Sequence, residues 1–314
     1  MTGSELCNKV IGEVSNVIVG KDEVIKKIML AIIAGGNILI EDVPGTGKTT
    51  LALSFSKAMS LDYNRIQFTP DVMPSDVTGF SMYNKKTGEF EYVKGGIMCN
   101  MFLADEINRT SSKTQSALLE AMEEHKVTVD GKTRPIPEPF IVMATQNPVG
   151  SVGTHMLPES QVDRFMFKLS MGYPSVENEV MMLKGKQGSN PLDRVTPVFS
   201  GEILCKIREE VDNIFVHDSI YEYIAKISAK TRDMSEVALG ISPRGSIAIL
   251  KAAKANAYMN SRNYVVPDDI KEILLSTAEH RVILNTKAKL SGVKVSDIVN
   301  RILKETKVEE HNEK

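Results

Sequence analysis

The stretch at residues 37–50, N-I-L-I-E-D-V-P-G-T-G-K-T-T, decides the fold class of this 314-residue chain. Its apolar run at 38–40 is typical of a buried strand, the glycines that follow favour a tight loop, and residues 51–58 are rich in helix formers. A strand, a glycine-containing loop and a helix in this order form the context of a phosphate-binding loop. The stretch therefore predicts an α/β domain that binds a nucleotide.

The residues of this loop suggest how a nucleotide is held. Gly45 and Gly47 can turn backbone N–H groups inward, and the N-terminus of the helix adds partial positive charge. Lys48 would reach the β- and γ-phosphates, and the Thr49 hydroxyl would hold Mg²⁺. The motif G-x-x-x-x-G-K-[ST] expects glycine where this chain has Asp42, but Asp tolerates turn geometry, so we expect the loop to close. The predicted ligands are ATP and Mg²⁺, and the predicted loop contacts are Pro44, Gly45, Thr46, Gly47, Lys48, Thr49 and Thr50.

Composition narrows the class of protein. The chain is 42% hydrophobic and 25% charged, as in ordinary globular proteins, and its length allows one large or two moderate domains. With 38 Lys and Arg against 40 Asp and Glu, it lacks a global basic footprint, so no nucleic-acid partner is expected. Its three cysteines are widely spaced, which disfavours a disulfide framework or zinc site and fits a reducing cytoplasm. We see no signal peptide and expect no membrane span.

Further apolar runs at 65–68, 100–106, 140–145 and 165–169 alternate with helical patterns. This alternation predicts a mainly parallel, doubly wound sheet covered on both faces. Two hairpins interrupt it, one around a Thr87-Gly88 turn and one at 127–134 around Asp130-Gly131.

The character of the sequence changes after Pro174. A turn-rich tract is followed by helical patterns near 202–211, 218–232, 243–259, 267–284 and 297–304. We therefore expect a nucleotide-binding α/β domain over residues 1–174, a linker over 175–197, and a smaller all-helical lid over 198–314.

Asp105 and Glu106 close the strand predicted at 100–106 and are the main catalytic candidates. Doubly wound sheets bind ligands at the carboxyl ends of their strands, so both acids should lie beside the phosphate loop. Asp105 would hold Mg²⁺, mostly through water, and Glu106 would polarise the water that attacks the γ-phosphorus. The alternative, a helix cap made from spare acids, is disfavoured by the preceding G-x-G-K-T.

Three further residues are candidates for contact with phosphate. Asn147 follows the fourth predicted strand and could hold the attacking water, although a turn-forming Asn before Pro148 is an equal alternative. Arg164, in V-D-R-F, could act on a neighbouring subunit, where such an arginine can change the rate by roughly 10³ to 10⁵. Arg244, in S-P-R-G, begins a lid helix and could sense phosphate. The alternative for both arginines is an ordinary surface charge.

From about residue 10 to residue 304, the chain resembles the MoxR family of AAA+ ATPases. The resemblance is carried by six motifs in order: I-E-D-V-P-G-T-G-K-T (40–49), F-L-A-D-E-I-N-R-T-S-S-K-T-Q-S-A-L-L-E-A-M-E-E (102–124), V-T-V-D-G (127–131), A-T-Q-N-P (144–148), L-P-E-S-Q-V-D-R-F (157–165) and S-P-R-G (242–245).

The resemblance implies a role for each candidate. Val19 and Gly20 would contact adenine, Lys48-Thr49 would form Walker A, and Asp105-Glu106 would form Walker B. Asn147 would be sensor 1, Arg164 the arginine finger and Arg244 sensor 2. Residues 71–96 would be the helix-2 insert, which lines the pore of a ring, and 127–134 the hairpin before sensor 1. An E-D-V-P-G start is familiar in this family, so Asp42 is compatible with it.

The resemblance also implies a ring, usually a hexamer, that remodels or matures protein partners in a chaperone-like way. Such partners often carry von Willebrand factor A domains. Two alternatives stay open from the sequence: a metal-chelatase or nucleic-acid motor subunit on the same core, and a scaffold that binds ATP with little turnover. The intact set of acids, asparagine and arginines disfavours the scaffold.

Overall fold

A five-stranded parallel sheet lies at the centre of the fold, in a computed structural model that describes residues 1–43, 45–147, 157–185 and 191–307. The strand order is β2-β5-β8-β1-β9, so β1 lies between β8 and β9. The strands are β1 (Ile38–Glu41), β2 (Tyr63–Gln67), β5 (Met101–Asp105), β8 (Ile141–Gln146) and β9 (Phe167–Leu169). The predicted doubly wound α/β fold is confirmed.

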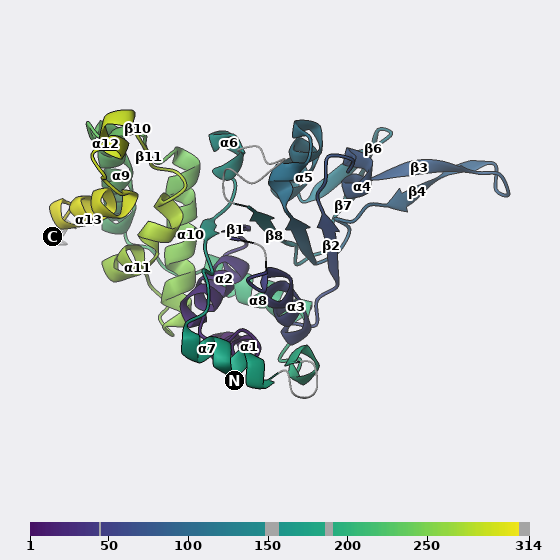
Figure 1. The fold of residues 1–314 in the computed structure, drawn as a ribbon, viewed down its shortest axis with the longest axis horizontal. Coiled ribbons are helices and arrows are strands. Elements are labelled where there is room, and N and C mark those ends of the chain that lie inside the picture. The colour runs from purple at the N-terminus through teal and green to yellow at the C-terminus, as the bar shows by residue number, and fades with distance from the viewer. Residues whose placement is uncertain (44, 148–156, 186–190, 308–314) are drawn as a thin grey trace.

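The sheet is covered on both faces, and its inner strands β5 and β8 are buried throughout, whereas the edge strand β2 is largely exposed. Along β5, Met101 and Leu103 pack into one hydrophobic cluster, whereas Phe102 and Ala104 pack into the other. Helices α1 (Gly3–Ser15), α2 (Asp22–Ile33) and α3 (Lys48–Ala58) cover the first face. Helix α5 (Ser112–Glu124) covers the second, as Figure 1 shows.

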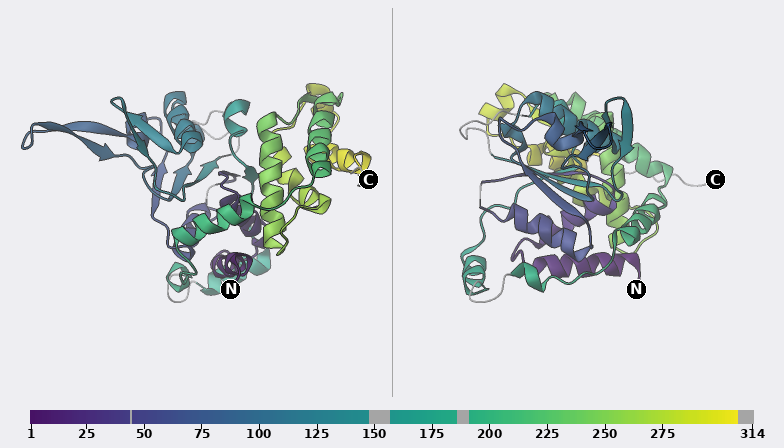
Figure 2. Two further views of the ribbon diagram at one scale, coloured as in Figure 1. Left: turned by 180° about the vertical axis from the view of Figure 1, so that it is seen from behind. Right: turned by 90° about the vertical axis from the view of Figure 1, so that its right-hand side faces the viewer.

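Two antiparallel hairpins leave the sheet domain. The first, β3 (Gly79–Asn84) with β4 (Glu89–Lys94), follows the short helix α4 (Pro74–Thr78) and projects far from the body (Figures 1 and 2). The second, β6 (Lys126–Val129) with β7 (Lys132–Pro135), has Asp130 and Gly131 in its turn, both with positive φ. Both hairpins lie where the sequence predicts them.

The C-terminal part is mainly helical and forms the left side of Figure 1. Its elements are α8 (Gly201–Asp212), α9 (Asp218–Asp233), α10 (Pro243–Met259), α11 (Pro267–Ala278), α12 (Thr286–Leu290) and α13 (Val295–Glu305), with a small ribbon of β10 (Val237–Leu239) and β11 (Ile283–Leu284). The helix expected over 267–284 ends at Ala278, and Ile283 and Leu284 at its predicted end form strand β11, which pairs with β10. Within the described residues, no helix combines the length and apolar character that a membrane span requires.

Two of the longer helices, α1 and α7 (Val176–Gly185), were not expected from the sequence. Helix α1 begins at a capping box in which Thr2 accepts a hydrogen bond from the Glu5 N–H and Glu5 accepts one from the Thr2 N–H. Helix α7 occupies part of the span expected as a linker. The short helix α6 (Glu159–Val162) precedes it in the chain, and the short turn η2 (Pro191–Arg194) follows it.

Arg281 joins the lid to the sheet domain. Its guanidinium pairs with Asp163 (2.7 Å) and donates to the backbone carbonyls of Phe165 and Met166. Asp163 also accepts a hydrogen bond from the Ser242 hydroxyl (2.8 Å), which fixes the start of α10. This buried junction sets where the lid residues stand relative to the sheet.

Candidate nucleotide-binding site

The phosphate loop connects β1 to α3 and has the features that phosphate binding needs. Gly45 and Gly47 have φ of 86° and 89°, and Gly47, at the N-cap of α3, has no side chain to cap the first N–H groups of this helix. The Lys48 amine is buried and donates to the carbonyls of Asp42 (3.0 Å) and Val43 (2.8 Å). Burial lowers the pKa of Lys48, against the opposing charge of nearby carboxylates. These residues fit a bound phosphate group.

Asp42 takes the place of the expected glycine because its side chain anchors the loop. The carboxylate is only 7% exposed and accepts hydrogen bonds from the N–H groups of Val43 (2.9 Å), Met171 (2.8 Å) and Gly172 (2.6 Å). Met171 and Gly172 follow β9, so one side chain ties the beginning of the loop to the neighbouring strand.

The two acids at the end of β5, Asp105 as its last residue and Glu106 directly after it, lie in different environments. Asp105 accepts hydrogen bonds from Thr145 Oγ1 (2.6 Å) on one oxygen and from Arg65 Nη2 (2.6 Å) on the other. Because both oxygens have partners, an ion held by Asp105 through water fits better than one held directly.

Glu106 has a left-handed backbone (φ 58°), which is uncommon for a residue with a Cβ. Its N–H donates to Thr145 Oγ1 (2.9 Å), and its carboxylate contacts Arg109 (2.7 Å) and the Asn147 side-chain amide (3.0 Å). Partial burial raises the pKa of Glu106, but the hydrogen bonds from Arg109 and Asn147 outweigh it and hold this pKa below its ordinary value. The glutamate is therefore ionised at neutral pH and able to accept a proton.

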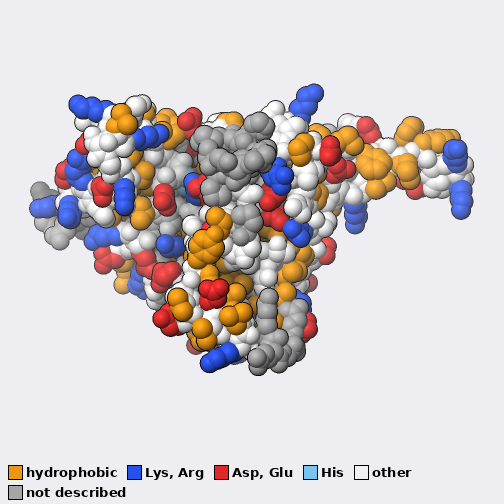
Figure 3. Space-filling model, viewed as in Figure 1, with side chains coloured by type: hydrophobic (Ala, Val, Ile, Leu, Met, Phe, Trp, Pro, Cys, Tyr) orange, Lys and Arg blue, Asp and Glu red, His pale blue; other side chains and the backbone are white. Residues whose placement is uncertain are grey.

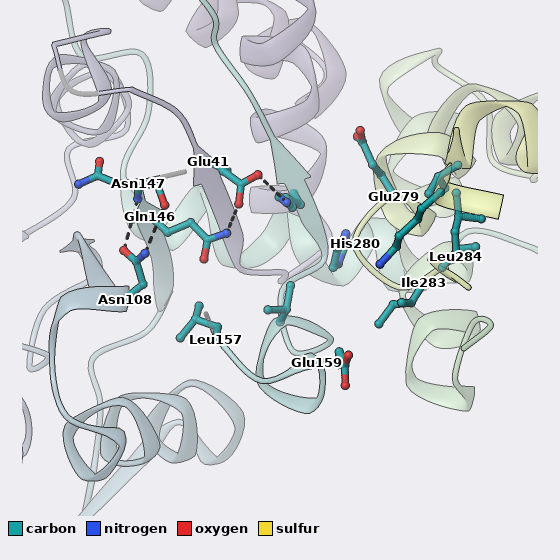
Figure 4. Close-up of a pocket in the computed structure, with 15 residues that line it drawn as sticks. Glu41, Asn108, Gln146, Asn147, Leu157, Glu159, Glu279, His280, Ile283 and Leu284 are labelled. Carbon is teal, nitrogen blue, oxygen red and sulfur yellow. Dashed lines mark hydrogen bonds and ion pairs between the residues drawn. The ribbon is translucent and has the colours of Figure 1, made fainter. Parts of the chain in front are cut away.

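Asn147 lies next to Glu106, to which its side-chain amide donates a hydrogen bond. Its backbone is fixed by Asn108, which donates to the Asn147 carbonyl (3.2 Å) and accepts from the Asn147 N–H (3.3 Å). Figure 4 shows this pair at one side of a cavity of about 380 Å³. Core residues Glu41 and Gln146 and lid residues Glu279 and His280 line the same cavity, which lies between the carboxyl ends of the strands and the lid.

The other predicted nucleotide contacts surround the loop. Thr49 and Thr50 lie in the first turn of α3, and Thr46 Oγ1 donates to the Val43 carbonyl (3.3 Å). Val19 and Gly20 lie between α1 and α2, and the preceding Ile18 reaches within 3.9 Å of where a Cβ at Gly47 would stand. Pro44 lies outside the described residues. The described residues include no group of three His, Cys, Asp or Glu that could hold a metal ion by itself.

Gly20 packs closely against α7. A Cβ at this position would lie 1.8 Å from Asn178 Nδ2, the end of a flexible side chain that can shift, so it is the positive φ of +73° that favours glycine here.

The two candidate arginines lie away from this set. Arg164 and Arg244 both form an ion pair with Glu123, near the C-terminal end of α5, at 2.6 Å and 2.5 Å. In the described part of the chain, neither has a hydrogen bond or ion pair with the phosphate loop, Asp105 or Glu106.

Several residues of the site were not singled out from the sequence. Arg109 lies within the longest family motif, and its place three residues after Glu106 is a signal that could have identified it. Arg65, Thr145 and Glu123 gave no such signal because their partners are distant in sequence.

Comparison with known proteins agrees with this geometry. Residues 37–167 match the family described as "ATPase family associated with various cellular activities (AAA)", and residues 229–302 match the "AAA lid domain". The chain is 51% identical to the protein YeaC of Bacillus subtilis, covering 96% of this chain and 95% of that protein. It is 37% identical to Chaperone MoxR1 of Mycobacterium tuberculosis, and the match covers 94% of this chain and 80% of that protein.

A solved structure from Cytophaga hutchinsonii, which carries a provisional ATPase assignment, superposes with a TM-score of 0.91 at 39% identity, covering 98% of this chain and 96% of that one. The family matches, the extent of the relatives and the shared fold lead to one conclusion: the chain belongs to the MoxR family of AAA+ ATPases.

Proposed function

We propose that the chain is one subunit of a ring, usually hexameric in this family, in which ATP and Mg²⁺ bind between neighbouring subunits. One subunit would supply the phosphate loop, Asp105, Glu106 and Asn147, and its neighbour would supply Arg164 and Arg244. The observation that carries the proposal is the pairing of both arginines with Glu123, apart from the loop of their own subunit. Arginines in that position can serve a nucleotide bound by another copy.

Within one site, the described residues divide the work. Lys48 would exchange its two loop carbonyls for phosphate oxygens, and Thr49 and Asp105 would hold Mg²⁺. When bound, the ion supplies charge neutralisation and orientation of the phosphates. Glu106 would accept the proton of the attacking water, and Asn147 would orient the Glu106 carboxylate through the contact at 3.0 Å. Val19 and Gly20 would contact the adenine.

The long hairpin supports a protein client. Four of its apolar side chains are exposed, and Phe90 is the most exposed at 73%; the others are Phe80, Met82 and Tyr83. Figure 3 shows hydrophobic side chains along the projecting hairpin, with basic side chains at its far end. Apolar side chains gathered on a projecting element mark a surface that contacts another molecule.

On this basis we assign residues 71–96 as the insert that meets the client, 1–174 as the nucleotide-binding domain and 198–314 as the lid. The name of the relative Chaperone MoxR1 supports remodelling or maturation of proteins. A partner with a von Willebrand factor A domain is the client class that the family suggests, and the reducing cytoplasm is the compartment that we propose.

The test is ATP turnover by mixed rings. We expect wild-type ATPase activity to rise cooperatively with protein concentration, together with the appearance of a ring in sedimentation velocity. Glu106→Gln and Arg164→Ala should each be inactive alone. Their mixture should regain turnover, because an Arg164→Ala site can receive arginines from a Glu106→Gln neighbour.

Arg301→Ala is a matched control, because Arg301 is a lid arginine paired with Glu236. It should retain wild-type activity. Mixtures that stay inactive while both proteins enter one ring would contradict catalysis shared between subunits.

A further inference from the structure

Glu123 receives a different arginine on each of its carboxylate oxygens. Arg164 Nη1 contacts Oε2 at 2.6 Å, and Arg244 Nη2 contacts Oε1 at 2.5 Å. The three side chains come from α5, from the turn after α6 and from the first turn of α10. One carboxylate thus forms ion pairs with an arginine of the sheet domain and an arginine of the lid.

Hydrogen bonds to neighbouring residues fix the positions of the two arginines. Arg164 Nη1 also donates to the Leu119 carbonyl (3.1 Å), and Asp163 holds Ser242, the cap of α10, at 2.8 Å. The backbones that carry the two arginines are therefore fixed, while the side chains of Glu123, Arg164 and Arg244 remain 33%, 28% and 48% exposed.

The charges of this cluster explain why a carboxylate is needed. Two guanidinium groups that share a single partner would repel each other without it. The guanidinium of arginine donates to carboxylate and phosphate oxygens with the same geometry, so a carboxylate can hold the arginines in the orientation that a phosphate would use.

We propose that Glu123 is a positioning residue for ATP hydrolysis, which holds Arg164 and Arg244 side by side for delivery to the nucleotide of the neighbouring subunit. The inference rests on the proposed function. Glu123 touches neither the phosphate loop nor the acids of its own subunit in the described structure, so its effect is exerted through the two arginines.

The first test is Glu123→Gln, which keeps the shape of the side chain and removes its charge. Because partly exposed ion pairs contribute little individually, we expect kcat to fall about threefold to tenfold. KM for ATP should change less than twofold, since Lys48 and its loop are unaltered. Glu123→Asp, which keeps the charge, should regain part of the lost rate.

Glu124→Gln is the matched control, because the Glu124 carboxylate on the same helix pairs with Lys126 instead (3.0 Å). It should retain wild-type kcat. A fall in kcat equal to that of Glu123→Gln would show that any charge lost from this end of α5 suffices, and would overturn the proposal.

Mixed rings separate the proposal from a merely structural role. In a mixture of Glu123→Gln with Glu106→Gln, each Glu123→Gln site can receive correctly held arginines, so turnover per Glu123→Gln subunit should rise. In a mixture of Glu123→Gln with Arg164→Ala, turnover per Glu123→Gln subunit should not rise, because neither protein can supply correctly held arginines to its neighbour.

The mixture of Arg164→Ala with Glu106→Gln distinguishes the two levels of the argument. Suppose that this mixture regains turnover, whereas the mixture of Glu123→Gln with Glu106→Gln does not. The proposed role of Glu123 is then overturned, and catalysis shared between subunits is supported. If neither mixture regains turnover although mixed rings form, shared catalysis fails and the role of Glu123 fails with it.

Discussion

Replacing Asp42 by the glycine of the general phosphate-loop motif should lower both the stability of this protein and its affinity for nucleotide. The carboxylate accepts hydrogen bonds from the N–H groups of Met171 and Gly172, which follow β9, and from that of Val43. Glycine offers no acceptor, so the connection between the beginning of the loop and the strand beside it would be lost.

The size of the effect follows from the two longer-range hydrogen bonds. A hydrogen bond to a charged group contributes about 1.5–3 kcal/mol. Met171 is buried, whereas Gly172 is partly exposed and its N–H can regain water. We therefore expect Asp42→Gly to lower the free energy of unfolding by about 2–4 kcal/mol, to which the flexibility of glycine adds about 0.5–1 kcal/mol.

The assay is urea unfolding followed by circular dichroism, combined with calorimetric binding of a non-hydrolysable ATP analogue. We expect a lower unfolding midpoint and weaker binding of the analogue. Asp130→Gly is a matched control, since it makes the same chemical change at a hairpin turn where φ is 50° and glycine is favoured. The anchoring role would be refuted if Asp42→Gly kept a free energy of unfolding within about 0.5 kcal/mol of wild type and an unchanged affinity for the analogue.

Three further predictions concern separate parts of the molecule. Arg109→Gln should raise the pKa of Glu106, because it removes a hydrogen bond and a charge that favour the carboxylate; the acidic limb of the kcat/KM profile should move to higher pH, and an unmoved limb would contradict this. Arg281→Met should lower the free energy of unfolding in urea by about 3–5 kcal/mol, since it breaks a buried ion pair, whereas Arg301→Met, which breaks an exposed one, should cost about 0–1 kcal/mol. Phe90→Ser should change stability by less than about 0.5 kcal/mol but reduce binding of an unfolded test protein in a pull-down; equal binding by both proteins would argue against a client surface on the hairpin.

The sequence predicts those parts of the fold that depend on local pattern. Strands β1, β5, β8 and β9 coincide with apolar runs, because both faces of the sheet are buried there, whereas the edge strand β2 is polar and largely exposed. Helix α1 also carries a local signal in the sequence, since Thr2 and Glu5 have the spacing of a capping box. Helix α7 was obscured by the turn-rich residues that follow it.

The partners of charged side chains could not be predicted, because they depend on tertiary contacts. Asp163 and Arg281 are 118 residues apart in sequence yet form a buried ion pair. The sequence makes Arg164 and Arg244 separate candidates for contact with phosphate and gives no sign that both contact Glu123. The departure at Asp42 was visible in the sequence, but its reason required the position of the chain after β9.

Every charged group proposed for hydrolysis outside the loop already has a partner in the isolated subunit. Arg65 pairs with Asp105, Arg109 with Glu106, and Glu123 with two arginines. Binding of nucleotide and neighbour would therefore exchange ion pairs and would create few new ones. Partly exposed ion pairs contribute only about 0–1 kcal/mol each, so breaking them costs little free energy. Side chains without such partners would instead lose conformational entropy when they are ordered in each cycle. A subunit built in this way keeps its charged groups oriented before assembly, and the proposed hydrolysis would then depend on the arrival of the neighbouring subunit.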